Sequence, residues 1–129
     1  PAGLKGKGEL RHAPSHIIDV APTCLAAAGL PVKGMEGKSL LPVFSKDSKE
    51  ERILYWEHEG NRAMRDGKWK LVAKGANGSW ELYDIKTDRT ELNNLAEKRP
   101  KRLRRMAAQW ESWAVAALAK PWPWGKNRK

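Results

Sequence analysis

The sequence predicts an α+β fold in which a small antiparallel β-sheet of three to four strands packs against a long C-terminal helix, preceded by a short helix. Three observations predict it. Between residues 53 and 84, short runs of alternating apolar and polar residues are separated by turn residues such as Asp66-Gly67. After Pro100, apolar residues recur at steps of three and four. Before Gly29 lies an alanine-rich stretch that favours a helix.

The first predicted helix covers about residues 18–28. Asp19 is the expected N-cap, and Pro22 is tolerated in the first turn because its missing N–H has no partner within the helix. Gly29 ends the helix. Residues 31–50 are rich in glycine, proline and polar residues, so we expect an irregular linker loop there.

The predicted strands follow in sequence order and are joined by short turns. The β-prone runs are residues 53–56, 63–65, 68–72 and 80–84. In the third run, Trp69 alternates with Lys68 and Lys70, so we expect it to face the long helix near Trp110 or Trp113. We expect Leu71 on the side of the lysines.

The last predicted element is a helix over about residues 100–119, since Pro100 suits a first turn and Pro121 ends the pattern. Residues 121–129 form a basic tail. One face of the helix is apolar: Leu103, Met106, Ala107, Trp110, Trp113, Ala114, Ala117 and Leu118.

Seven tryptophans in a short chain admit two interpretations: a stacking platform for sugars or bases, or a sheet–helix core. Their positions on alternating strands and on the apolar helix face favour the core. The residues concerned are Trp56, Trp69, Trp80, Trp110 and Trp113. Trp122 and Trp124 fall outside every predicted element, where they could dock onto a further domain or a neighbouring molecule.

The net charge of +10 is concentrated at one end of the chain. Residues 98–129 hold ten basic residues and one acidic residue, whereas residues 1–97 hold 15 basic and 14 acidic. A basic nucleic-acid-binding module is therefore an alternative, but the solvated face of a helix is the commoner origin of such a run. No apolar run approaches the roughly 20 residues that span a bilayer, so no membrane partner is expected.

The chain offers little of its own for catalysis or metal binding. Cys24 is the one cysteine, and its position among alanines predicts a buried structural thiol. Glu57 and Glu59 can share a strand face without His58, which makes a poor metal site. We expect no catalytic residue, no metal ligand and no cofactor site in this chain. The absence of an initial Met predicts that it starts partway through a longer protein.

Three stretches together resemble the C-terminal region of sulfatases of the arylsulfatase type, in the alkaline-phosphatase superfamily. Residues 15–29 resemble the family helix "HIIDxxPTxLxxAG", and residues 37–42 its "GxSLLP" loop. Residues 56–72 are similar to the segment with an "AvRxGxWKL" hairpin, and residues 81–96 to "ELYDL…DPxExxNLA". One departure is Arg89, where the family usually has Pro.

The resemblance implies that residues 1–50 end the N-terminal sulfatase domain, and that residues 51–120 form a C-terminal subdomain at the rim of the substrate cleft. The missing N-terminal domain would be the main partner, and a sulfate ester the substrate of the whole enzyme. That domain would carry a formylglycine nucleophile and calcium or another divalent metal. Cys24 lacks the Pro and Arg of the formylglycine motif. A periplasmic or secreted location follows from the resemblance alone.

Within the loop over residues 57–62, we expect Glu57, His58, Asn61 and Arg62 at the substrate-pocket rim, because rim loops often carry function. The competing interpretation makes Asn61 a turn residue and places Arg62 in a surface ion pair. A free-standing interaction module without enzymatic function remains a further alternative for the whole chain.

Overall fold

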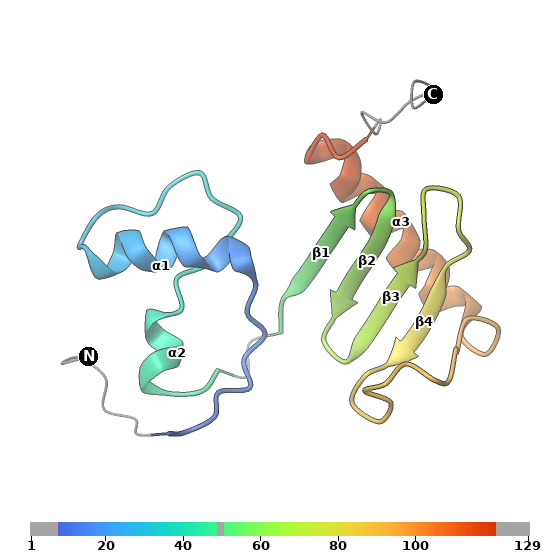
Figure 1. The fold of residues 1–129 in the computed structure, drawn as a ribbon, viewed down its shortest axis with the longest axis horizontal. Coiled ribbons are helices and arrows are strands. Elements are labelled where there is room, and N and C mark those ends of the chain that lie inside the picture. Colours follow the sequence, from blue (N-terminus) through green and yellow to red (C-terminus); the bar gives the residue numbers. More distant parts are fainter. Residues whose placement is uncertain (1–7, 49–50, 121–129) are drawn as a thin grey trace. The chain divides into compact units, whose positions relative to one another are not determined.

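The computed structural model describes residues 8–48 and 51–120, and the chain divides into two units, residues 1–51 and residues 52–129 (Figure 1). The predicted basic tail, with Trp122 and Trp124, lies outside the described residues. Within residues 8–48 and 51–120, no helix is long and apolar enough to cross a membrane.

The first unit contains a 3-10 turn, η1 (Ile17–Asp19), followed by helix α1 (Val20–Ala27) and helix α2 (Leu41–Ser45). η1 and α1 lie where the helix over residues 18–28 is predicted. The irregular loop predicted for residues 31–50 is wrong in one part, because α2 forms within it. Pro42 lies in the first turn of α2, where its missing N–H costs no helical hydrogen bond.

Asp19 is the N-cap residue of α1 as predicted, but its side chain makes no capping hydrogen bond to that helix. It is fully buried and accepts hydrogen bonds from the backbone N–H groups of His16 (2.8 Å) and Lys38 (2.9 Å). The carboxylate thus joins the start of the helix to the loop that follows it. Gly37 permits this approach, since a Cβ there would lie 2.0 Å from the carbonyl oxygen of Ile18.

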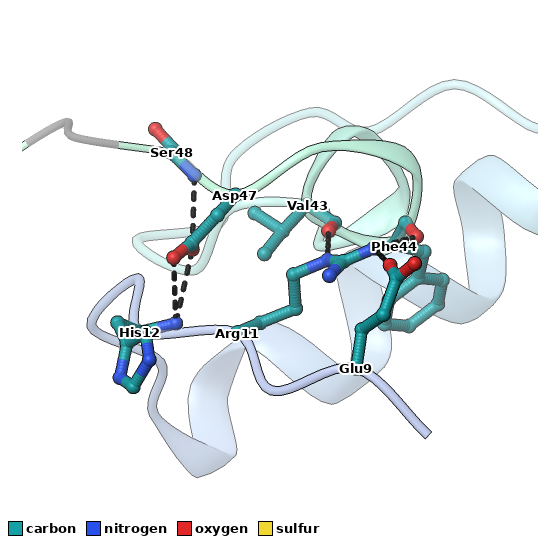
Figure 2. Close-up of polar contacts among 7 residues, drawn as sticks. All are labelled: Glu9, Arg11, His12, Val43, Phe44, Asp47 and Ser48. Atoms are coloured by element: carbon teal, nitrogen blue, oxygen red, sulfur yellow. Dashed lines mark hydrogen bonds and ion pairs between the residues drawn. The ribbon is translucent and has the colours of Figure 1, made fainter. Parts of the chain in front are cut away.

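Hydrogen bonds join the segment around Arg11 and His12 to the end of α2 and the residues that follow it (Figure 2). The guanidinium of Arg11 donates to the carbonyl oxygens of Val43 (2.9 Å) and Phe44 (3.3 Å), which favours the C-terminal end of a helix. Asp47 accepts from the backbone N–H of His12 at 2.9 and 3.0 Å. That hydrogen bond contributes most to lowering the pKa of the Asp47 carboxyl.

Helix α1 is largely exposed within its unit, and Pro22 is its one buried residue. Cys24 is exposed, so the predicted buried thiol is wrong. The sequence pattern correctly marks a small-residue helix, but among the described residues little packs over it. Ile17 and Val20 are 77% and 51% exposed.

We therefore expect the backbone amides of α1 to exchange with deuterium faster than those of the central strands around Leu71 and Leu82. An isolated helix of eight residues is marginal in water, whereas Leu71 and Leu82 are fully buried. Hydrogen exchange read by NMR measures both in one sample. Equal protection of α1 would contradict this expectation and would show that the helix is covered in solution.

The second unit is an antiparallel sheet crossed on one face by a long helix (Figure 1). The strands are β1 (Ile53–His58), β2 (Asn61–Asp66), β3 (Trp69–Ala73) and β4 (Glu81–Asp84), and they lie side by side in that order. Helix α3 (Pro100–Ala116) follows. This is the predicted α+β architecture.

The core lies between the sheet and α3. The register places Tyr55, Met64, Leu71 and Leu82 beside one another, so that these four side chains share one face of the sheet. Six residues form the fully buried cluster: Met64, Leu71, Leu82, Met106, Trp110 and Ala114. Trp110 is the largest of them, and its Nε1 donates to the carbonyl oxygen of Trp56 at 3.1 Å.

Two of the predicted side-chain positions in the sheet are wrong. Leu71 does not share a strand face with Lys68 and Lys70. Residues two apart in a strand lie on the same face, so Leu71 lies on the face of Trp69, where it is buried in the core. Trp56 is absent from the sheet–helix cluster, because it alternates with Tyr55, which packs against that cluster.

Trp69 packs against the cluster as predicted but is only half-buried. Its ring lies 4.6 Å from the Arg102 guanidinium and 4.9 Å from the Lys68 amine, at the edge of the core. Both cations lie against its ring, and Trp110 belongs to the cluster on which Trp69 packs.

Helix α3 ends three residues before the predicted residue 119. Leu118 has a φ of 56° and is 85% exposed, so the apolar face does not extend to it. The backbone N–H of Lys120 donates to the carbonyl oxygen of Ala114 at 3.1 Å, which closes the helix end. The left-handed residue redirects the chain, a feature that periodicity does not reveal.

Candidate functional site

The four predicted rim residues lie together at the turn between β1 and β2. Glu59 and Gly60 both have positive φ, 51° and 85°, as a tight two-residue hairpin turn requires. Glu57 Oε1 accepts from the Gly60 N–H at 2.7 Å, and Asn61 Nδ2 donates to the carbonyl oxygen of His58 at 3.0 Å. Glu57 and Asn61 therefore stabilise the turn itself.

This turn is joined to the loop between β3 and β4. Asn61 Oδ1 accepts from the Gly75 N–H at 3.0 Å, and Arg62 Nη2 donates to the carbonyl oxygen of Gly78 at 2.6 Å. A Cβ on Gly78 would lie 1.9 Å from the Lys74 carbonyl oxygen, so glycine is required for the tight loop. The two loops form one hydrogen-bonded edge of the sheet.

Arg62 is buried and faces α3 rather than solvent. Its guanidinium carbon lies 4.3 Å from the Trp80 ring centre and 5.7 Å from that of Trp110, and Nη1 lies 3.8 Å from Glu111. Burial lowers the pKa of Arg62, while the Glu111 carboxylate raises it. The sequence did contain the signal for this placement, because Arg62 alternates in phase with Met64, a core residue.

His58 and Asn61 are the exposed members of the group, and Glu57 is half-buried. An imidazole and an amide at a loop edge can exchange hydrogen bonds with a polar ligand. A hydrolytic reaction needs more: an activated nucleophile with a base, or a metal-bound water. This edge of the sheet can therefore contact a substrate and does not supply a reaction centre.

A second concave region lies on the β1 side of α3 and was not predicted. It is lined by Tyr55, Arg105, Ala108, Gln109, Ser112 and Trp113. The rings of Tyr55 and Trp113 stack with centres 5.0 Å apart and planes 5° from parallel. The sequence pattern predicted Trp113 as a core residue. The structure places it at the border of the core, where it is partly buried and also lines this hollow.

The residues of this chain do not fit the calcium and formylglycine that the resemblance implies. Cys24 is followed by Leu25 and alanines, so the Pro and Arg of the formylglycine motif are missing. Among residues 8–48 and 51–120, no group of three His, Cys, Asp or Glu side chains could hold a metal ion. No reaction step can be derived from these residues.

Comparison with known proteins identifies the family. A family model described as N-sulphoglucosamine sulphohydrolase, C-terminal, matches residues 1–112. An uncharacterized sulfatase, PB10D8.02c of Schizosaccharomyces pombe, is 31% identical over 73% of this chain and 20% of its own length. Human arylsulfatase K is 34% identical over 65% of this chain and 19% of its own length. The chain thus spans about a fifth of these relatives.

The fold has solved counterparts as well. The structure of BT1596, described as a 2-O GAG sulfatase, superposes with a TM-score of 0.58 and 29% identity, covering 76% of this chain and 24% of that one. Because the family model covers most of the chain, this protein belongs to the sulfatase family described as N-sulphoglucosamine sulphohydrolase, C-terminal.

Proposed function

We propose that this chain is the C-terminal part of an enzyme that hydrolyses sulfate esters of carbohydrates. The observation that carries the proposal is the family match over residues 1–112. BT1596 is described as a 2-O GAG sulfatase, which supports a sugar as the alcohol part of the ester, and the family description names N-sulphoglucosamine, a sugar sulfated on nitrogen. The nucleic-acid-binding alternative is not favoured, because the relatives are sulfatases.

In this proposal, residues 1–50 complete the larger catalytic domain, and residues 51–120 form a subdomain beside its cleft. The exposed apolar residues Ile17 and Val20 support the first part, since such side chains are normally covered by a partner. Formylglycine and calcium, or another divalent metal, belong to the remaining four-fifths of the enzyme. This chain contributes binding surface and mechanical support.

At the rim, we assign the direct substrate contact to His58 and Asn61, with Glu57 and Arg62 as positioning residues. His58 and Asn61 are exposed, although Asn61 also bonds to the turn and to Gly75, whereas Glu57 and Arg62 are more buried and hold the turn and the adjoining loop. Both exposed side chains offer hydrogen bonds of the kind that sugar hydroxyls and sulfate oxygens accept.

The 129-residue chain alone is expected to show no sulfatase activity, because its sequence lacks the formylglycine motif and residues 8–48 and 51–120 hold no metal site. A chromogenic aryl sulfate and a sulfated glucosamine, each with and without calcium, are the substrates for the assay. The intact enzyme containing this chain is expected to release sulfate from the sulfated sugar. Turnover by the purified chain above a heat-inactivated sample would refute the first expectation, and an inactive intact enzyme would refute the proposed function.

In the intact enzyme, His58→Ala is expected to raise KM for the sulfated sugar by about 5-fold and to leave kcat nearly unchanged. The reason is the loss of one hydrogen bond made equally in the ground state and the transition state. Lys86→Ala, at an exposed position beyond β4, is the control and should change neither constant. Equal KM values for His58→Ala and the wild type would remove His58 from the rim.

A further inference from the structure

The loop between β3 and β4 carries an asparagine followed directly by a glycine. This pair, Asn77 and Gly78, lies between Ala73, the last residue of β3, and Glu81, the first residue of β4. Asn77 is exposed, so water has access to it. It is also the one asparagine of the chain that precedes a glycine, the others being Asn61, Asn93, Asn94 and Asn127.

Hydrogen bonds hold the side chains of other asparagines but not that of Asn77. Asn61 Nδ2 donates to a backbone carbonyl oxygen, and Asn61 Oδ1 accepts from a backbone N–H, both at 3.0 Å. Asn94 Oδ1 accepts from two backbone N–H groups, at 2.9 and 3.1 Å. Within residues 8–48 and 51–120, the Asn77 side chain has no hydrogen-bond partner. Its amide is therefore free to rotate towards the backbone of the next residue.

The next residue is one that the loop cannot exchange for a bulkier one. A Cβ on Gly78 would lie 1.9 Å from the carbonyl oxygen of Lys74. Glycine has no side chain, so nothing attached to its Cα hinders the approach of another group to its backbone nitrogen. The close packing of the loop therefore keeps an unhindered nitrogen directly after an exposed asparagine.

We infer that Asn77 is a site of spontaneous deamidation, with water as the co-reactant. The Gly78 nitrogen forms a bond to Cγ of Asn77, and the bond between Cγ and Nδ2 breaks. The side-chain amide leaves as ammonia, which carries away the proton of the Gly78 N–H, and a cyclic succinimide remains. Water then opens the ring at either of its carbonyl carbons. The products are aspartate and isoaspartate, and each gains a carboxylate that is ionised at neutral pH.

Isoaspartate alters the loop because its main chain runs through Cβ and Cγ of the former asparagine. The extra atom lengthens the backbone before Gly78 by about 1.5 Å. Gly78 already packs against Lys74 without room for a Cβ, and its carbonyl oxygen accepts from Arg62 Nη2 at 2.6 Å. The added length therefore displaces Gly78 and weakens its hydrogen bond to Arg62. Ordinary aspartate keeps the native backbone and leaves this bond in place.

The displacement reaches the turn between β1 and β2, because that turn contacts the same loop. The Gly75 N–H donates to Asn61 Oδ1, and a Cβ on Gly60 would lie 3.1 Å from the backbone nitrogen of Ala76. A loop lengthened by isoaspartate thus loosens the edge of the sheet that the two loops form. None of these contacts depends on the proposed function.

A different modification fits the same stretch of sequence. Asn77-Gly78-Ser79 matches the Asn-x-Ser pattern of N-glycosylation. That reaction needs an enzyme and an activated sugar donor, whereas deamidation needs only water and the loop itself. A glycan on Nδ2 prevents the loss of ammonia. Glycosylated Asn77 in protein purified from its natural source would therefore contradict the inference.

The experiment incubates the 129-residue chain, produced in bacteria, at neutral and at alkaline pH and follows each asparagine by peptide mass spectrometry. Asn77 is expected to deamidate at least about 10-fold faster than Asn61, Asn93 or Asn94. The rate should rise with pH, because the Gly78 nitrogen attacks after losing its proton. Protein isoaspartate methyltransferase should label the product at this site. Deamidation of Asn77 no faster than that of Asn93 would show that the inference is wrong.

A synthetic peptide of residues 70–84 measures the reaction without the fold. The folded chain is expected to react within about 10-fold of the peptide, because the loop is exposed. Protection by more than about 100-fold would mean that the loop holds Asn77 away from Gly78, and the site would be lost.

Two substitutions separate the reaction from its effect on the loop. Asn77→Gln should gain no charge at this position, because its longer side chain closes a larger ring far more slowly. Freshly prepared Asn77→Asp carries the charge on a native backbone and should keep the urea midpoint of the wild type. The deamidated fraction of aged wild-type chain, isolated by ion exchange, should unfold at lower urea than Asn77→Asp. Equal midpoints for these two samples would overturn the proposed displacement of Gly78.

Discussion

Trp110→Ala is expected to lower the free energy of unfolding of the second unit by about 3–5 kcal/mol. Trp110 is completely buried, and its ring meets those of Trp80 (centres 5.6 Å apart) and Trp113 (5.9 Å), each near 60° from parallel. Its removal also leaves the carbonyl oxygen of Trp56 without the indole donor. Since small domains are stable by roughly 5–15 kcal/mol, this single change approaches complete unfolding.

Trp69→Ala is the matched control, with the same loss of side-chain volume in the same unit. Trp69 is half-buried at the edge of the core, so the expected loss is about 1–2 kcal/mol. Urea denaturation followed by far-UV circular dichroism compares the midpoints of the two variants. The urea midpoint of Trp69→Ala should be the higher of the two. If it is equal to or lower than that of Trp110→Ala, the core is centred near Trp69 on β3 and not near Trp110 on α3.

The sequence predicts the sheet and the long helix well because both depend on local periodicity. Alternation and the Asp66-Gly67 turn locate the strands, and steps of three and four locate α3, within a few residues of the observed bounds. The helix end is missed because it depends on one left-handed residue, Leu118, whose conformation no periodic pattern marks.

Depth within the core is harder to predict than the face on which a residue lies. The pattern puts Trp69 and Trp110 on facing surfaces but does not tell which is central. The register settles this point: Met64, Leu71 and Leu82 are neighbours in the cluster with Trp110, while Trp69 lies two residues before Leu71, at the first residue of β3. For Cys24, the pattern correctly predicts a helix but wrongly predicts a buried thiol, because the burial of a helix depends on what packs against it and not on its own sequence.

The candidate rim residues illustrate the same limit. Proximity in sequence correctly brings Glu57, His58, Asn61 and Arg62 to one end of the hairpin. The two-residue turn pairs Glu57 with Arg62 and His58 with Asn61. Their division into exposed and buried members follows from strand alternation, which places Arg62 in phase with Met64. Its partners, Trp80 and Gly78, come from a loop 16 or more residues away, and no local pattern predicts them.

Arg62→Ala is expected to destabilise the second unit by about 2–4 kcal/mol. The substitution removes a buried side chain that stacks on Trp80 and leaves the carbonyl oxygen of Gly78 without its 2.6 Å hydrogen bond. Glu111 also loses its nearest guanidinium, although Lys120 still pairs with it at 2.5 Å. The loop between β3 and β4 should loosen first, which hydrogen exchange at residues 74–79 can detect.

Three further substitutions identify the cause of the loss. Arg62→Met keeps most of the volume without the charge, so a loss of only about 1–2 kcal/mol is expected, because a desolvated charge costs stability that the apolar side chain does not. Arg62→Lys is expected to lose more than Arg62→Met, since an ammonium group lacks the planar fork that stacks and donates together. Arg89→Ala, at an exposed loop position, should stay within about 0.5 kcal/mol. Urea midpoints in the reverse order, with Lys better than Met, would show that the positive charge itself holds this edge of the sheet, and the packing account of Arg62 would be wrong.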